Sequence, residues 1–229
     1  MANLEPLIQS IPVAPLKLAS LEGCRTLADQ VNNYLVSFRH ESPTNVGQAD
    51  SLQGYCADSY LLECECPRFG SGEGKGVLKE SVRGCDLFIM VDVTNYSLTY
   101  RVNGYENHMS PDNHYQDLKR IISAADGKAR RINVIMPFLY EGRQHKRSKR
   151  ESLDCALMLQ ELVDMGVSNI LTFDAHDPRV SNSIPLHGFD SFMPTYQFLK
   201  ALVNSVPDFV IDNDHLMIIS PDEGAMGRA

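Results

Sequence analysis

Apolar residues recur along the chain with two different periods. From Leu21 to Phe38 they return every three or four positions, which predicts a helix with one buried stripe. Residues 40–55 are polar and contain Pro and Gly, so we expect a loop there. Strands are predicted for three segments: the alternating Tyr60–Cys66, the short Gly76–Lys79, and the continuous apolar run Asp86–Val93.

The remainder of the chain alternates between strand and helix patterns. Residues 94–111 are expected to form an irregular insertion, and Asp112 to cap a helix that reaches Ala125. The later elements are a strand at Ile132–Met136, a helix at Ser152–Met165 ended by Gly166, a strand at Asn169–Phe173, a helix at Tyr196–Val203 and a strand at Leu216–Ile219. This order predicts an α/β fold, with a mostly parallel sheet flanked by helices.

Composition narrows the class of protein. The chain has 229 residues, of which 43% are hydrophobic and 22% charged, as is usual for a soluble globular protein. It shows no membrane-length apolar run and no secretory signal, so we expect a cytoplasmic protein whose six cysteines are reduced. The net charge of −8 argues against a general nucleic-acid binder, and we expect neither nucleic-acid nor membrane partners.

Two familiar site patterns are present only in fragments. Cys64-x-Cys66 suggests zinc, but no second Cys/His pair follows at a suitable spacing, and strand alternation would place both sulfurs on one face. The glycine-rich stretch 70–76 (GSGEGKG) fits neither the P-loop nor the dinucleotide fingerprint. We predict a hairpin or flexible turn for it.

Polar side chains follow three of the predicted strands, and ligands of parallel sheets gather beyond the carboxyl ends of the strands. The groups are Arg143, Gln144, His145 and Lys146, then Asp174, His176 and Asp177, and finally Ser220, Asp222 and Glu223. Arginines bind phosphate oxygens, and Mg²⁺ takes one or two carboxylates together with phosphate oxygens. The combination predicts a Mg²⁺–nucleotide site. Alternatives stay open: the basic run 143–150 suits a solvated loop, a strand-end His is often structural, and Asp222 could be a helix N-cap.

Several of these segments, in the same order, resemble one family. VIMPFLYEGRQHKR, ILTFDAHDP and IISPDEGAMGRA, preceded by RFGSGE (68–73) and ESVRGCDLFIM (80–90), are similar to the N-terminal half of ribose-phosphate pyrophosphokinases. The resemblance implies two phosphoribosyltransferase-like domains in tandem. Residues 1–229 would be the N-terminal one, with a helix and extension at 1–55, an insertion at 94–111, and the C-terminal domain absent.

The same resemblance implies an activity and a site. The enzyme, a ribose-phosphate diphosphokinase, would move diphosphate from Mg²⁺-ATP to ribose 5-phosphate for nucleotide biosynthesis, giving phosphoribosyl pyrophosphate and AMP. It would work as a homo-oligomer, a dimer or a hexamer. By position, the implied roles are ATP binding for Arg143 and Gln144, contact with the adenine of a neighbouring subunit's ATP for Phe69 and Glu73, and metal binding for His176 and Asp222.

The chain also departs from the family pattern. Ser71 and His145 stand where the family usually has Asp, and Ala225 replaces a usual Gly. Catalytic residues are unknown: the catalytic loop and the ribose-phosphate loop follow the Asp222 segment in the family, so we expect this fragment alone to be inactive. Two other functions stay open. One is a non-catalytic regulatory paralogue that binds a synthetase, and the other is a metal-dependent hydrolase built on Asp174 and His176.

Overall fold

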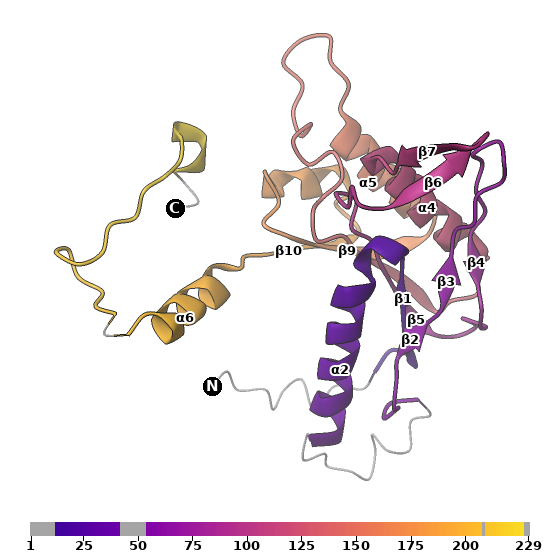
Figure 1. Cartoon of the computed structure of the whole chain (residues 1–229), viewed down its shortest axis with the longest axis horizontal. Helices are drawn as coiled ribbons and strands as arrows, with labels where there is room; N and C mark the ends of the chain where they lie inside the picture. The colour runs from indigo at the N-terminus through magenta and orange to yellow at the C-terminus, as the bar shows by residue number, and fades with distance from the viewer. Residues whose placement is uncertain (1–11, 42–53, 208, 227–229) are drawn as a thin grey trace. The chain divides into compact units, whose positions relative to one another are not determined.

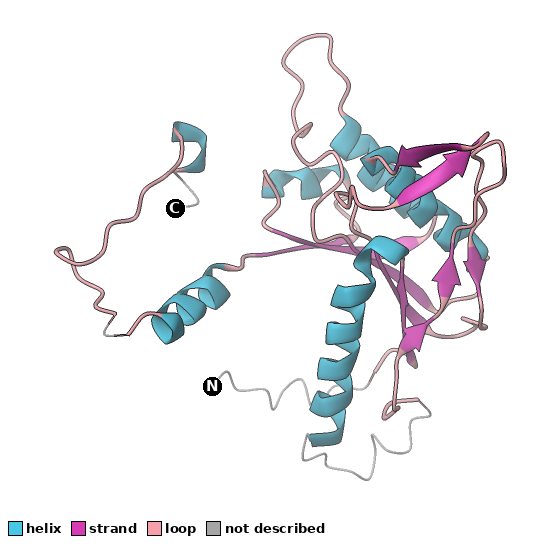
Figure 2. Ribbon diagram, in the orientation of Figure 1, coloured by secondary structure: helices cyan, strands magenta, loops and turns pink. Residues whose placement is uncertain are grey.

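The computed structural model describes residues 12–41, 54–207 and 209–226, which fall into two units, Met1–Phe192 and Met193–Ala229. The first unit is built on a six-stranded sheet in the order β10-β9-β8-β5-β1-β2, with every pair of neighbours parallel (Figures 1 and 2). These strands are β1 Leu16–Ser20, β2 Leu61–Leu62, β5 Asp86–Met90, β8 Arg131–Ile135, β9 Val167–Phe173 and β10 Gly188–Phe192. The expected parallel α/β sheet is confirmed.

Helices cover both faces of the sheet (Figure 2). The helix α2 (Arg25–Glu41) lies on one face, and α4 (Pro111–Ala124) and α5 (Asp154–Asp164) lie on the other. Strand β5 packs against helices on both faces, because its successive side chains point to opposite faces of the sheet. Leu87 and Ile89 join the larger core cluster with α4 and α5, whereas Met90 joins a smaller cluster with α2. Both clusters bury apolar surface, which is the main stabilising term of such a fold.

Two sheet strands and one hairpin were not foreseen from the sequence. Strands β1 and β10 are additional, and residues 94–111 are not irregular. They contain an antiparallel hairpin of β6 (Thr99–Val102) and β7 (Tyr105–His108). Its turn is Asn103-Gly104, with φ of 50° and 85°, the conformation that the mirror-image hairpin turns require. The expectation that this segment is irregular was therefore wrong, because an Asn-Gly pair is itself a hairpin signal.

Smaller corrections concern element ends. The predicted strand Tyr60–Cys66 is two pieces, β2 and β3 (Cys64–Glu65), and β3 pairs antiparallel with β4 (Val77–Leu78). The cap of α4 is Ser110, whose hydroxyl accepts from the Asn113 amide at 3.2 Å, and Asp112 lies inside the first turn. Pro111 at the first helical position fixes the helix start two residues earlier than predicted. The helix α5 ends at Asp164, and Gly166 (φ 92°) follows its cap residue Met165, as expected for a helix stopped by glycine.

The second unit contains α6 (Thr195–Ser205), as predicted, and a short 3₁₀ turn, η3 (Glu223–Ala225). The predicted strand Leu216–Ile219 is not formed. Over residues 209–226 the structure describes no other strand for it to pair with, and Met217, Ile218 and Ile219 are 80%, 69% and 77% exposed. A parallel strand depends on its neighbours for hydrogen bonds, so an apolar run alone does not make one. Among the described helices none has the length and apolar character to cross a bilayer.

Candidate functional site

The loops that follow β8 and β9 meet at the carboxyl edge of the sheet. His145, from the first loop, lies with its Nε2 3.6 Å from Oδ2 of Asp177 in the second. The His145 ring also packs against the ring of His176, with centroids 5.1 Å apart and planes tilted by 54°. The sequence-predicted groups at two neighbouring strand ends are therefore brought together.

The loop after β8 is shaped by backbone turns that leave Arg143 on the outside. The amides of Gly142 and Gln144 donate to Leu139 (3.0 Å) and Glu141 (2.8 Å), and Glu141 has a positive φ of 53°. Gln144 closes the loop, because its Nε2 donates to the Ser152 carbonyl at 2.7 Å. The Arg143 side chain is exposed and makes no hydrogen bond or ion pair with any described residue. Its guanidinium is available for a ligand.

His145 is held at both nitrogens. Its Nδ1 lies 3.0 Å from the carbonyl oxygen of Arg143, and its Nε2 faces Asp177. The side chain retains 12% of its exposure. Since Nδ1 faces an acceptor, the geometry favours a proton on that nitrogen. His145 thus ties the backbone at Arg143 to the loop after β9.

The loop after β9 begins with a strained residue. Asp174 has a positive φ of 45°, and its amide donates to the Phe192 carbonyl at the end of β10 at 2.9 Å. The next amide, of Ala175, donates to Ser191 Oγ at 2.9 Å. Non-glycine residues in this backbone region cost energy and are common at functional sites. The turn leaves His176 exposed toward the loop after β8.

Asp177 is an anion with its oxygens already engaged. Arg179 donates to them from Nε (2.9 Å) and Nη2 (2.5 Å), and its amide adds a third bond at 3.0 Å. These bonds, led by that from the Arg179 side chain, hold the pKa of Asp177 well below its usual range. The carboxylate faces His145 but has little capacity left for a metal ion.

The base of the first loop is anchored to α4 through two stacked tyrosines. The rings of Tyr115 and Tyr140 lie 4.6 Å apart at 8°, and Tyr140 Oη donates to Asp112 at 2.6 Å. Burial, followed by the bond to Asp112, raises the pKa of Tyr140. Burial raises the pKa of the neighbouring Glu141 as well, with smaller contributions from acidic neighbours. The loop therefore combines a cationic tip with a fixed, acidic base.

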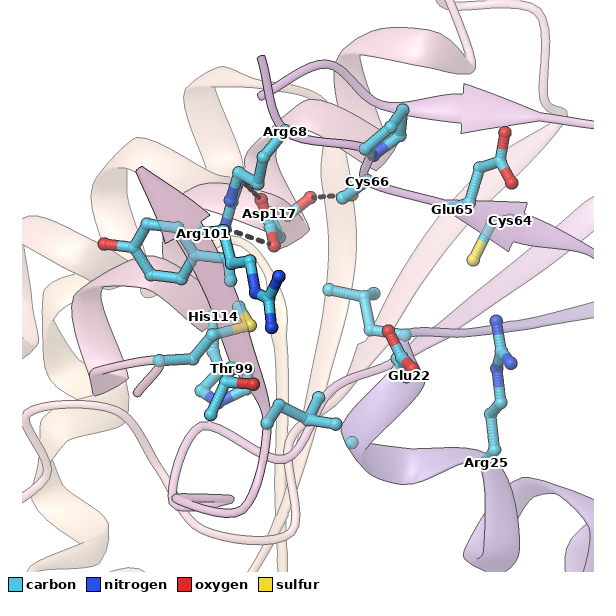
Figure 3. Close-up of a pocket in the computed structure, with 16 residues that line it drawn as sticks. Glu22, Arg25, Cys64, Glu65, Cys66, Arg68, Thr99, Arg101, His114 and Asp117 are labelled. Carbon is cyan, nitrogen blue, oxygen red and sulfur yellow. Dashed lines mark hydrogen bonds and ion pairs between the residues drawn. The ribbon is translucent and has the colours of Figure 1, made fainter. Parts of the chain in front are cut away.

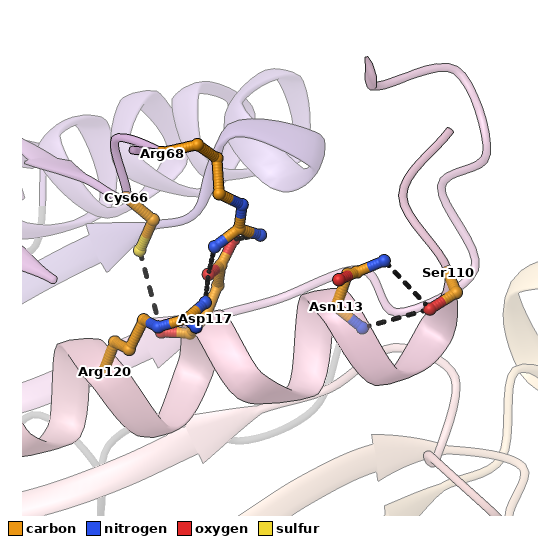
Figure 4. A network of polar contacts seen from close by, with 6 residues as sticks. All are labelled: Cys66, Arg68, Ser110, Asn113, Asp117 and Arg120. Carbon is orange, nitrogen blue, oxygen red and sulfur yellow. Dashed lines mark hydrogen bonds and ion pairs between the residues drawn. The ribbon is translucent and has the colours of Figure 1, made fainter. Parts of the chain in front are cut away.

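Phe69 and Glu73 lie in a separate hairpin, here termed the Phe69 turn (residues 68–74). The Phe69 amide donates to the Glu73 carbonyl at 2.7 Å, which leaves the phenyl ring 55% exposed. Arg68 anchors the turn through two bonds to Asp117 of α4, at 2.6 and 2.8 Å (Figure 4). Ser71 Oγ donates to the Glu73 carboxylate at 2.8 Å. The turn predicted for 70–76 is confirmed, and it presents an aromatic ring and a carboxylate outward.

Asp222 belongs to the second unit and serves as the N-cap of η3. Its Oδ1 accepts from the Ala225 amide at 2.8 Å. The sequence had placed it at the end of a strand, and that strand is not formed at Leu216–Ile219. The N-cap alternative is the one observed. A role for Asp222 in metal binding stays a prediction.

A cavity of about 490 Å³ lies elsewhere in the first unit, between the start of α2, β3, β6 and α4 (Figure 3). Sequence reasoning missed it, since it depends on the unforeseen β6–β7 hairpin. Cys64 and Cys66 both line it, which agrees with the expectation that the two sulfurs share a face. Within the part of the chain that the structure describes, no group of three or more His, Cys, Asp or Glu side chains could hold a metal ion.

Comparison with known proteins identifies relatives of this chain. Residues 16–166 match the family model of the N-terminal domain of ribose phosphate pyrophosphokinase. A ribose-phosphate pyrophosphokinase of Staphylococcus epidermidis is 28% identical over 173 residues, covering 74% of this chain and 48% of that protein. One from Corynebacterium ammoniagenes is 27% identical over 220 residues, covering 93% and 55%. The chain thus spans about half the length of the curated relatives it matches.

A solved structure shares the fold. The phosphoribosylpyrophosphate synthetase from Mycobacterium smegmatis superposes with a TM-score of 0.59 and 22% identity, over 83% of this chain and 52% of that one. At this identity the likeness concerns the fold alone. It agrees with the parallel sheet and the flanking helices described above.

Proposed function

The chain belongs to the family of the N-terminal domain of ribose phosphate pyrophosphokinase, and from this membership we propose that it forms the ATP-binding half of such an enzyme. In the proposed reaction the bond between the β-phosphorus of ATP and the oxygen that bridges it to the α-phosphate breaks, and that oxygen stays with AMP. A new bond joins the β-phosphorus to the 1-hydroxyl oxygen of ribose 5-phosphate, the hydroxyl proton leaves, and AMP departs. The observation that carries the proposal is the contact between the loops after β8 and β9.

In this proposal Arg143 and Gln144 hold the nucleotide. The Arg143 guanidinium is exposed and can bind phosphate oxygens in a bidentate manner. The side-chain amide nitrogen of Gln144 donates to the Ser152 carbonyl, so the side-chain amide oxygen remains to accept a hydrogen bond from the ligand. His145 positions both residues, since it fixes the Arg143 carbonyl and faces Asp177.

The residues present fit a magnesium ion that is bound largely by its nucleotide. Mg²⁺ usually keeps water and phosphate ligands and takes few protein groups, so a cage of three protein side chains is not needed. His176 is exposed at the meeting point of the two loops, whereas Asp177 is engaged by Arg179. We propose His176 as the residue of this edge that holds Mg²⁺ with its triphosphate. The ion would neutralise charge on the phosphoryl group being transferred.

The other assigned residues serve the same reaction from a distance. Phe69 and Glu73 face outward on the Phe69 turn, where they can reach the adenine of ATP bound to a neighbouring copy, so we propose a homo-oligomer, a dimer or hexamer. Asp222 would hold a metal ion that helps to bind and polarise the ribose substrate. Residues 1–229 would form the N-terminal phosphoribosyltransferase-like domain, and the groups acting on ribose 5-phosphate would come from the half of the relatives that this chain does not match. We also propose a cytoplasmic location.

Nucleotide binding tests the proposal. We expect calorimetry to show ATP binding by this chain that strengthens with Mg²⁺ and weakens about tenfold in Arg143→Gln. Lys149→Gln, an exposed cation of the same basic loop, is the matched control and should keep its affinity. Binding that is independent of Mg²⁺, or weakened equally by both substitutions, would refute the assignment. A chain with both halves should then release AMP from ATP only with ribose 5-phosphate, whereas a purely regulatory paralogue would release none.

A further inference from the structure

The cavity of about 490 Å³ in the first unit has no role in the proposed reaction. Its walls come from the residues around the start of α2, from β3 and the three residues after it, from β6 and from α4 (Figure 3). Neither the basic loop nor the loop after β9 contributes to it. Its volume falls within the range of about 300–1,000 Å³ that is usual for small-molecule sites.

Three of the six ionic side chains in the cavity walls are already paired. Asp117, only 4% exposed, is shared by Arg68 (2.6 Å) and Arg120 (2.6 Å), and Glu65 is bonded to Lys79 at 2.6 Å. These pairs neutralise two of the three carboxylates in the walls, and Glu22 is the third. The shared carboxylate leaves one positive charge uncompensated, and the Glu65 pair leaves none.

Two further guanidiniums in the walls have no partner. Arg25, the first residue of α2, and Arg101, in the middle of β6, make no ion pair or side-chain hydrogen bond within residues 12–41, 54–207 and 209–226. Figure 3 shows Arg101 reaching into the cavity from the hairpin, with Arg25 on the far side. Glu22 subtracts one charge. The lining side chains themselves sum to zero, but with Arg120 and Lys79, which pair with two of them from outside the lining, five positive and three negative charges leave a net charge of two positive units around the cavity.

We propose that this cavity binds a phosphoryl group, either as free phosphate or as a small phosphate ester. Near neutral pH a phosphate carries about −1.5 to −2 charges, which matches the net charge of the walls taken together with their two ion-pair partners. Guanidinium forks bind phosphate oxygens in pairs, and two forks from different elements can grip one phosphoryl group. A single carboxylate would leave one of these charges uncompensated.

The remaining wall residues are compatible with an anion. His114 is 2% exposed and its Nε2 is 2.7 Å from the Asn95 carbonyl, so the ring is fixed as part of the wall. Burial raises the pKa of Cys64 to about 11 and that of Cys66 to about 12. Both thiols are therefore neutral at physiological pH and add no negative charge. The anion would connect the β6–β7 hairpin to the start of α2.

Titration calorimetry tests the proposal, with inorganic phosphate and glycerol 3-phosphate injected separately in a buffer free of other polyvalent anions. We expect binding at one saturable site, and the affinity of that site should fall about tenfold in Arg101→Gln and in Arg25→Gln. The affinity of Arg101→Lys should lie between those of the two Gln variants and the wild type, because lysine keeps the charge but lacks the paired N–H donors of a guanidinium. Tighter binding of the ester than of phosphate would identify an ester as the ligand, and equal binding would identify the free ion.

Two controls separate this cavity from the nucleotide site. Arg83→Gln, an exposed arginine outside the cavity, and Arg143→Gln in the basic loop should both retain phosphate binding. Arg25 and Arg101 stabilise no described partner, so melting temperatures should stay close to the wild type. Amide shifts in NMR spectra should locate the anion at Gly23, Leu98 and Met109. The proposal is overturned if binding does not saturate, or if Arg143→Gln abolishes it while Arg25→Gln and Arg101→Gln do not. Neither result depends on Mg²⁺-ATP binding.

Discussion

Replacing Asp117 by Asn isolates the charge that anchors the Phe69 turn. The carboxylate accepts from Arg68 at 2.6 and 2.8 Å and from Arg120 at 2.6 Å, and its side chain is 6% exposed. The Arg68 side chain is itself only 10% exposed. Removing one partner of a buried ion pair costs about 3–5 kcal/mol, because the remaining charge stays buried without compensation. We expect the lower value, about 3 kcal/mol, since Asn keeps one acceptor and Arg120 reaches water.

Chemical unfolding measures this cost directly. Urea denaturation should be followed by circular dichroism, because the chain contains no Trp. A loss of about 3 kcal/mol corresponds to a melting temperature lowered by about 6–12 °C in a domain of this size. The Phe69 amide, bonded to the Glu73 carbonyl, should also exchange its hydrogen faster in Asp117→Asn.

Glu65→Gln is the matched control for this prediction. Its ion pair with Lys79 has the same 2.6 Å distance, but the two side chains are 46% and 44% exposed. Water screens such a pair, so the substitution should cost no more than about 1 kcal/mol. If Asp117→Asn proves no more destabilising than Glu65→Gln, burial does not set the strength of the anchor and our reasoning is wrong.

Further predictions concern other parts of the first unit. The Cys66 thiol, with its pKa raised to about 12 by burial, should form about a thousandfold less thiolate than an ordinary thiol and alkylate slowly until the protein is unfolded, as mass spectrometry can follow. Gly76→Ala should cost about 1–3 kcal/mol in urea unfolding, because its Cβ would lie 2.4 Å from the Arg120 carbonyl oxygen. Gly104→Ala should destabilise the β6–β7 hairpin by about 1 kcal/mol, seen as faster local hydrogen exchange, since φ is 85°. The pKa of Asp177 is lowered on folding, so its contribution to stability is present above the ordinary Asp value and is lost as pH falls below about 4. Asp177→Asn should therefore reduce the loss of stability between pH 4 and pH 2 in unfolding titrations.

The elements that the sequence predicts well are those whose own residues determine them. The run Asp86–Val93 and the run Ile132–Met136 are apolar on both faces, and both form central strands. Strand β1 was missed because LKLAS is short and carries Lys17, although its position between β5 and β2 makes it central. Conversely, Leu216–Ile219 has the apolar pattern and forms no strand. Pairing partners, which a local pattern does not contain, decide both cases.

In the candidate site, too, some features could be predicted from the sequence and others depend on the fold. Placing the Arg143 and His176 loops at one sheet edge required only the topological rule for parallel strands. The contact of His145 with Asp177 could not be predicted, because it depends on how two loops turn after leaving the sheet. The cavity of Arg25 and Arg101 was missed for another reason, since the hairpin that carries Arg101 had been read as irregular.

The central claim is that the loops after β8 and β9 bind one nucleotide together with its metal. Paramagnetic Mn²⁺ in place of Mg²⁺, added with ATP to the isotope-labelled chain, tests this by broadening NMR signals of nearby nuclei. We predict that the amides of Gln144 and His145 and those of residues 174–177 broaden together, and only when ATP is present. Broadening confined to one loop, or equal without ATP, would contradict a shared Mg²⁺–nucleotide site.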